Sequence, residues 1–217
     1  MLFTNFEFYP LMTVVIPLFP LIAHGLEIED FKKDKKKLLK FVYKEEKKDT
    51  DGLELSNAGG WHSNNNYHDH DNLLRDLLSK YVESFFGNRK IFNPEINPHL
   101  VGLWMNINRK GDYNKSHIHP DSHLSGVFWI KCPKNSGHLT FQSPHYFSQY
   151  NEVVSYTKEF RDEMISHPTY NVFAEEGRMI IFPSSLYHHV EPNKSDEDRI
   201  SVSFNINLVP KEGYVTS

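Results

Sequence analysis

Two segments of the chain alternate apolar and polar residues with period two, which is the pattern of β-strands whose faces meet different surroundings. The first segment has apolar residues at its odd positions, Val101, Leu103, Met105 and Ile107, with Gly102, Trp104, Asn106 and Asn108 between them. The second has apolar residues at its even positions, Ile200, Val202, Phe204, Ile206 and Leu208, between Arg199, Ser201, Ser203, Asn205 and Asn207. We therefore expect a sheet with one apolar and one polar face.

The polar face has an unusual composition for a surface exposed to water. Lys and Glu are missing between residues 201 and 207, where small hydroxyl and amide side chains stand instead. Such a lining is typical of a barrel that encloses a small polar ligand, although a half-exposed strand facing water explains either segment alone. Further short strands are predicted at 127–131, 137–142, 170–174 and 178–182. The predicted fold is mainly β, a sandwich or a barrel.

Two helices precede these strands in the sequence. Residues 27–48 and 72–87 carry apolar residues at helical spacing, and Asp71 or Asn72 is placed to cap the second helix. We expect both to cover the apolar face of the sheet. The intervening residues 56–71 are predicted to form a loop, residues 13–23 an entry strand, and residues 148–167 an insertion, helical over 152–164, that serves as a lid.

Length and charge restrict the class of protein. The 217 residues suit one domain over 1–217, with 1–98 supplying the strand, helices and loop, and 99–209 the β core with an insertion at about 144–168. A net charge of -4 argues against nucleic acid as a partner. The single cysteine, Cys132, is expected to be core filler, and it excludes a disulfide framework. With no membrane span or signal peptide recognised, we expect a cytoplasmic protein. A homodimer stays open.

The sequence His117-Ile118-His119 places two imidazoles two residues apart, so that on a strand both reach the same side and share one metal ion. A third ligand is expected from His188 or His189, which are neighbours and cannot both face inward. His119-Pro120-Asp121 offers a competing pair with the spacing of the two-histidine, one-carboxylate triad of non-haem iron oxygenases. We favour His117 and His119, because a pair ending at Asp121 leaves only a very short turn before the next strand.

Arg199 begins the last alternating segment and shares its face with Ser201. A guanidinium group binds a carboxylate with two parallel hydrogen bonds, so an arginine inside a barrel predicts an anionic ligand. A dicarboxylate would reach the metal with one end and Arg199 and Ser201 with the other. The alternative is an ion pair at the surface with Asp196, Glu197 or Asp198.

At these residues the sequence resembles a largely uncharacterised family of 2-oxoglutarate and Fe(II)-dependent oxygenases with a double-stranded β-helix fold. The shared motifs run through most of the chain: Pro17-Leu18-Phe19-Pro20, Ser56-Asn57, Gly60-Trp61-His62-Ser63, Trp104-Met105-Asn106, Gly111-Asp112-Tyr113-Asn114, His117-Ile118-His119-Pro120, Leu124-Ser125-Gly126-Val127, Ser136-Gly137-His138-Leu139, Phe182-Pro183-Ser184, His188, Val190, Pro192-Asn193 and Arg199 to Asn205. The resemblance implies a jelly-roll oxidoreductase, a dioxygenase that uses Fe(II), 2-oxoglutarate and O2 to hydroxylate a small molecule or a peptide.

By analogy with relatives of this fold, His188 is the distal metal ligand and Arg199 the anchor of 2-oxoglutarate. Candidate residues of the cofactor pocket are Asn106, Asn114, Ser125 and Trp129, with Trp104 beside them; either tryptophan is equally explained as core. Two other classes fit the same residues. One is a cupin-like three-histidine metal enzyme that does not use 2-oxoglutarate, and the other is a barrel without catalytic activity that binds a metal or a small acid.

Overall fold

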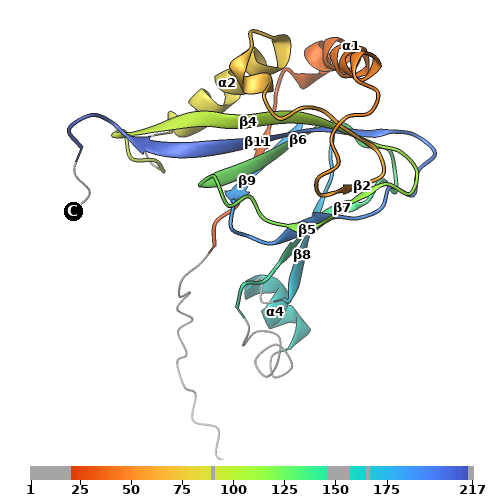
Figure 1. The fold of residues 1–217 in the computed structure, drawn as a ribbon. Coiled ribbons are helices and arrows are strands. Elements are labelled where there is room, and N and C mark those ends of the chain that lie inside the picture. The colour runs from red at the N-terminus through yellow and green to blue at the C-terminus, as the bar shows by residue number, and fades with distance from the viewer. Residues whose placement is uncertain (1–20, 89–90, 146–156, 165–166, 215–217) are drawn as a thin grey trace, which may run out of the picture.

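A computed structural model describes residues 21–88, 91–145, 157–164 and 167–214. Its main feature is a pair of antiparallel sheets (Figure 1). The first sheet has the order β1-β9-β6-β11-β4-β3. Its strands are β1 (His24–Glu27), β3 (Trp61–His62), β4 (Ile96–Asn108), β6 (Leu124–Lys131), β9 (Arg178–Pro183) and β11 (Arg199–Pro210). The second has the order β2-β5-β10-β7-β8, with β2 (Asn57–Ala58), β5 (Tyr113–His117), β7 (His138–Gln142), β8 (Thr169–Phe173) and β10 (His188–Val190). The prediction of a mainly β protein is confirmed.

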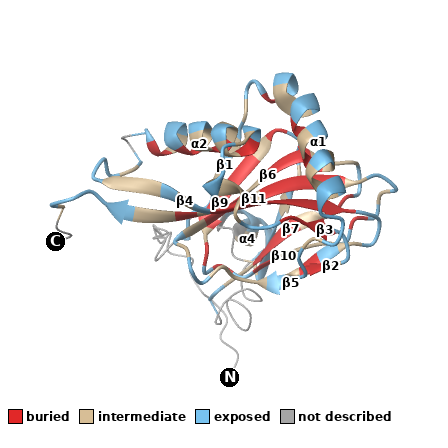
Figure 2. Ribbon diagram, turned by 45° about the horizontal axis from the view of Figure 1, so that its top comes forward, coloured by how far each residue is buried: buried red, intermediate tan, exposed pale blue. Residues whose placement is uncertain are grey.

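Helices α1 (Phe31–Lys48) and α2 (Leu73–Phe86) lie on the side of the first sheet that faces away from the second (Figure 1). Leu38, Val42, Leu74 and Leu78 from these helices belong to one buried cluster together with Met105 and most of the other apolar residues of β4 and β11. The apolar face of the alternating strands is thus covered, and Figure 2 shows the buried residues concentrated in these strands. The polar face turns to the second sheet.

A side-chain cap marks the start of α2, as the sequence predicted. The Oδ1 of Asn72 accepts hydrogen bonds from the backbone N–H groups of Leu74 and Arg75, at 3.0 and 2.9 Å, and so satisfies donors that the first turn of α2 leaves free.

The first helix, α1, begins later than predicted. Residues 24–27 instead form β1, which pairs with β9 in the register His24↔Ile181. The apolar–polar pattern around Glu27 therefore belongs partly to a strand.

Other boundaries also differ from the prediction. The segment 56–71 is not entirely loop, because it contains β2, β3 and the 3-10 turn η1 (Tyr67–Asp69). Of the entry strand predicted at 13–23, residues 13–20 lie outside the described residues and 21–23 are not strand. Of the predicted helix 152–164, the structure describes α4 (Lys158–Met164). No helix among the described residues is long and apolar enough to cross a membrane.

Val101 departs from the alternation. The pairing of β4 with β11 shifts between Asn205↔Gly102 and Ile206↔Leu100, so that Val101 is the extra residue of a β-bulge. Leu100 then packs against the apolar cluster, and Val101 is 38% exposed. A bulge of one residue reverses the side to which the following residues point, which is why the sequence pattern misplaced this side chain.

Candidate metal and anion site

Three histidines from two neighbouring strands and one loop meet between the sheets. His117 ends β5 and His188 begins β10, and the two residues are directly paired in the antiparallel register. His119 lies two residues beyond β5, where its backbone N–H donates to the carbonyl of Ser184 at 3.0 Å. One ring nitrogen from each histidine lies within 4.8 Å of the other two. This is the only such cluster of potential metal ligands among the described residues.

In two of the three histidines, a hydrogen bond determines which ring nitrogen is free to bind a metal. The Nδ1–H of His117 donates to the carbonyl of Lys115 at 2.7 Å, and the Nδ1–H of His188 donates to that of Leu186 at 2.8 Å. In a neutral imidazole the other nitrogen, Nε2, then carries a free lone pair. A backbone carbonyl bound to the far nitrogen is the usual second contact of a metal-binding histidine. The donor set therefore fits a transition metal such as iron.

The three imidazoles are held neutral. Burial, followed by repulsion from His188, His117 and His62, lowers the pKa of His119 to about 3. Burial and repulsion from His117 lower the pKa of His188 to about 4, and burial also lowers the pKa of His117. Because each neutral ring keeps its lone pair, the site is ready for a cation near neutral pH.

This neutrality predicts unusual pH dependence of metal binding. Protons and metal compete for the same lone pairs, so three histidines with an ordinary pKa of 6.5 would lose about 50-fold in affinity between pH 7.5 and pH 6. Here the pKa values of His119 and His188 lie below that window and burial lowers the pKa of His117, so we expect a loss of less than about fivefold. Isothermal titration with Co(II) at both pH values measures this ratio. An ordinary 50-fold loss would contradict the burial argument.

The competing ligands lie elsewhere. Asp121 is exposed, occupies the turn after β5 and is outside the histidine cluster. His189 also lies outside the cluster; it follows His188 in β10 and so projects to the opposite face of the strand. Sequence spacing alone left both open, because it does not show where the chain turns after His117.

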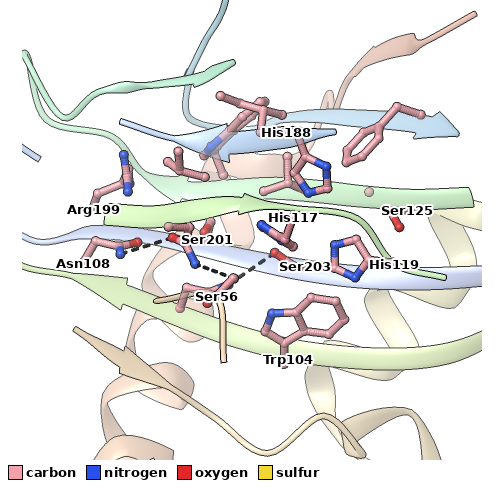
Figure 3. A pocket seen from close by; sticks show the side chains of 18 residues that line it. Ser56, Trp104, Asn108, His117, His119, Ser125, His188, Arg199, Ser201 and Ser203 are labelled. Carbon is pink, nitrogen blue, oxygen red and sulfur yellow. Dashed lines mark hydrogen bonds between the residues drawn. The ribbon is translucent and has the colours of Figure 1, made fainter. Parts of the chain in front are cut away.

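Arg199 lies in the same cavity as the histidines, and Figure 3 shows it at the opposite end. Its side chain is 1% exposed. Nη1 donates to the carbonyl of Ser136 and, at 3.2 Å, to that of Glu191, whereas Nη2 is buried without a partner among the described residues. Burial lowers the pKa of Arg199 to about 10. A buried guanidinium that lacks a carboxylate partner is costly unless a ligand supplies one.

The acids next to Arg199 in sequence do not pair with it. Asp196 forms an ion pair with Lys110 at 2.6 Å, and Glu197 forms one with Lys131 at 2.9 Å. Asp198 accepts a hydrogen bond from the hydroxyl of Tyr43 at 2.8 Å. The surface ion pair considered for Arg199 is therefore absent from the described part of the chain.

The cavity between the sheets is lined by both polar and aromatic side chains. All the pocket residues expected from sequence line it: Trp104, Asn106, Asn114, Ser125, Trp129, Arg199 and Ser201. Both tryptophans are also nearly fully buried, so wall and core are not exclusive descriptions. Arg199 is the only lysine, arginine or carboxylate among the described residues that line the cavity.

Sequence reasoning missed some lining residues. Asn108 and Ser203 lie on the alternating polar faces, which was the available signal, whereas Ser56 comes from the loop before β2. Asn114 links the loop before β2 to β4, because its amide donates to the Ser56 hydroxyl at 3.2 Å and its carbonyl oxygen accepts from the Asn108 amide at 3.5 Å. The amide of Asn106 donates to Ser203 at 3.2 Å. These bonds fix the polar wall between Arg199 and the histidines (Figure 3).

The two sheets enclose three neutral histidines and one buried arginine, a set of side chains that fits a metal and an anion. Comparison with known proteins agrees with this interpretation. The family model described as "Putative 2OG-Fe(II) oxygenase" matches residues 102–205, just under half of the chain, and this segment contains the three histidines and Arg199. No curated protein matches the chain.

Solved structures share the fold at low sequence identity. The carbocyclase SnoK of nogalamycin biosynthesis matches with a TM-score of 0.60 and 11% identity, over 89% of this chain and 83% of that one. A prolyl-4-hydroxylase from Pseudomonas putida matches with 0.55 and 12%, over 88% and 93%. The viral collagen prolyl hydroxylase of Paramecium Bursaria Chlorella virus-1 matches with 0.54 and 13%, over 85% and 94%. The chain spans 49% of an oxidoreductase of the 2OG-Fe(II) oxygenase family from Burkholderia pseudomallei.

The match over residues 102–205 makes the chain similar to the 2OG-Fe(II) oxygenase family. This similarity supports an oxidoreductase that uses Fe(II) and 2-oxoglutarate, with O2 as the second co-substrate. The three-histidine cluster is consistent with the iron.

Proposed function

We propose that His117, His119 and His188 hold Fe(II), that Arg199 and Ser201 hold the distal carboxylate of 2-oxoglutarate, and that the enzyme hydroxylates a small molecule or a peptide. The supporting observation is the unpartnered Nη2 of Arg199, which shares one cavity with the neutral histidines. We interpret the two facing sheets as the double-stranded β-helix, or jelly roll, of this family, with α1 and α2 as its outer support.

In this proposal, different residues bind the metal, bind the anion and form the cavity wall. The histidines offer lone pairs, and Arg199 offers two donors of fixed geometry to a carboxylate. Asn106, Asn114, Ser125 and Trp129 shape the wall between these ends and exclude bulk water. When bound, the iron supplies the oxygen-activating chemistry, and the protein supplies orientation and a dry cavity.

A second, open cleft adjoins the histidines and supports the proposal of an external substrate. His117, His119 and Trp104 line both this cleft and the inner cavity. The cleft also carries Glu54 and Lys115, among other side chains of mixed character. We propose that the substrate enters here, in a single-domain protein of the cytoplasm, where one unpaired cysteine and Fe(II) both suit a reducing environment.

Anaerobic titration tests the proposed function. After Fe(II) is added, 2-oxoglutarate should produce a weak visible charge-transfer band. As a matched control, 2-oxobutyrate keeps the keto-acid end but lacks the carboxylate that would meet Arg199, so we expect it to bind more than about 30-fold more weakly. Bound iron without a band on adding 2-oxoglutarate would contradict the proposal.

The donor set itself favours one alternative function. The cluster contains three histidines and no carboxylate, whereas the two-histidine, one-carboxylate triad marks non-haem iron oxygenases. A cupin-like metal enzyme that does not use 2-oxoglutarate has no need of Arg199. Equal affinity for 2-oxoglutarate and 2-oxobutyrate would favour this alternative.

A further inference from the structure

Trp104 contacts two imidazole rings. The indole stacks on His62, with ring centroids 5.7 Å apart and planes inclined by 14°. It also contacts His119 at 5.6 Å and 34°. His119 in turn stacks on His188 at 5.2 Å and 13°. A continuous series of rings therefore leads from β3 through β4 to the histidine cluster.

His119 differs from the other two candidate ligands in how its ring is held. The Nδ1 atoms of His117 and His188 are each bonded to a backbone carbonyl, whereas no hydrogen bond to the ring of His119 is found among the described residues. His119 also lies outside the regular strand, so the sheet does not fix its side chain. Ring contacts with Trp104, His188 and His117 are what restrain it.

His62 is well placed to restrain the ring of Trp104. It is 3% exposed, and its Nδ1–H donates to the carbonyl of Ser63 at 2.7 Å. Ser63 is tied to β4 through Met105, whose N–H donates to the Ser63 hydroxyl at 2.9 Å and whose carbonyl accepts from the Ser63 N–H at 3.0 Å. The His62 ring is therefore fixed to the same strand that carries Trp104.

We infer that Trp104, backed by His62, is a positioning residue that fixes the orientation of His119 as a metal ligand. Stacked aromatic contact would do for His119 what the carbonyl hydrogen bonds do for His117 and His188. The inference rests on the metal role proposed above for the three histidines, and it adds two residues that touch no metal themselves.

Titration of the full-length protein with Co(II), followed by its visible spectrum, tests the inference without any substrate. Trp104→Leu removes the stacking surface and should weaken Co(II) binding by about 10- to 100-fold, the range for residues that orient metal ligands. The ligand-field bands should change as well, because His119 is no longer held. Trp104→Phe and His62→Phe keep an aromatic ring and should stay close to wild type, whereas His62→Ala should resemble Trp104→Leu.

Trp61→Leu is the matched control. Trp61 precedes His62 in β3 and is also nearly fully buried, but it belongs to the apolar cluster beneath the helices. Its replacement should lower the melting temperature and leave Co(II) affinity and spectrum unchanged. Should Trp104→Leu fail to fold, His62→Ala and the two phenylalanine variants still test the inference.

The outcomes separate this inference from the proposed function. If wild-type protein binds no Co(II), the metal role of the histidines is wrong. If wild type binds but folded Trp104→Leu and His62→Ala bind equally well with an unchanged spectrum, the positioning role is wrong. Loss in Trp104→Phe as large as in Trp104→Leu would also overturn it, because stacking would then not be the cause.

Discussion

Replacing Arg199 by methionine should abolish tight binding of 2-oxoglutarate and leave metal binding intact. Methionine has similar length and no charge, so the distal carboxylate would lose its only cationic partner among the residues lining the cavity. Loss of one partner from a buried hydrogen-bonded charge pair costs about 2–5 kcal/mol, which is more than about 30-fold in affinity. Anaerobic titration of the Fe(II) protein with 2-oxoglutarate measures it.

The controls for this prediction use both the ligand and the side chain. Affinity for 2-oxobutyrate should be the same in wild type and Arg199→Met, because this ligand never reaches Arg199. Arg199→Lys keeps the charge but loses the planar pair of donors, so its affinity for 2-oxoglutarate should lie between those of wild type and Arg199→Met. If Arg199→Met binds 2-oxoglutarate as tightly as wild type does, Arg199 is not the anion-binding residue.

Arg199→Met also has a predicted effect on stability. Burial lowers the pKa of Arg199 because it disfavours the charge in the absence of a ligand, and neutral replacements of buried charges are often tolerated. We therefore expect a melting temperature near that of wild type for Arg199→Met without ligand. Adding 2-oxoglutarate with metal should raise the melting temperature of wild type and not that of the variant.

Replacing His119 by alanine should reduce metal affinity by more than about 100-fold. Even residues that only orient the metal ligands lower metal affinity by about 10- to 100-fold when they are replaced. Asp121→Ala is the matched control, because it removes the carboxylate of the competing motif two residues away. Asp121 is exposed and outside the cluster, so Co(II) affinity should stay within about twofold of wild type. A loss of Co(II) affinity in Asp121→Ala as large as that in His119→Ala would identify Asp121 as a ligand, as the competing motif requires.

Much of the fold was predictable because the alternation of β4 and β11 directly reflects burial on one face. Leu103, Met105 and Ile107 lie in the buried cluster, as their spacing predicted. Val101 was misplaced because a bulge depends on the pairing of two strands distant in sequence, which no local pattern shows. The strand β1 was missed for a related reason: four residues pair with β9, more than 150 positions away.

The candidate site was predictable where one face of a strand carries it. Asn106, Arg199 and Ser201 follow from the polar alternation, and they line the cavity with the three histidines. Ser56 and His62 did not follow, because they come from a segment without regular period whose place is set by short pairings of β2 with β5 and β3 with β4. The choice between His117 and Asp121 likewise depended on the turn after β5 rather than on spacing.

Diffraction at the iron absorption edge, from anaerobic crystals grown with Fe(II) and 2-oxoglutarate, would locate both the metal and its co-substrate. We predict one anomalous peak bonded to His117, His119 and His188, with 2-oxoglutarate bound to it and its distal carboxylate at Nη2 of Arg199. A peak bonded to Asp121 in place of His117, or 2-oxoglutarate lying away from Arg199, would contradict it.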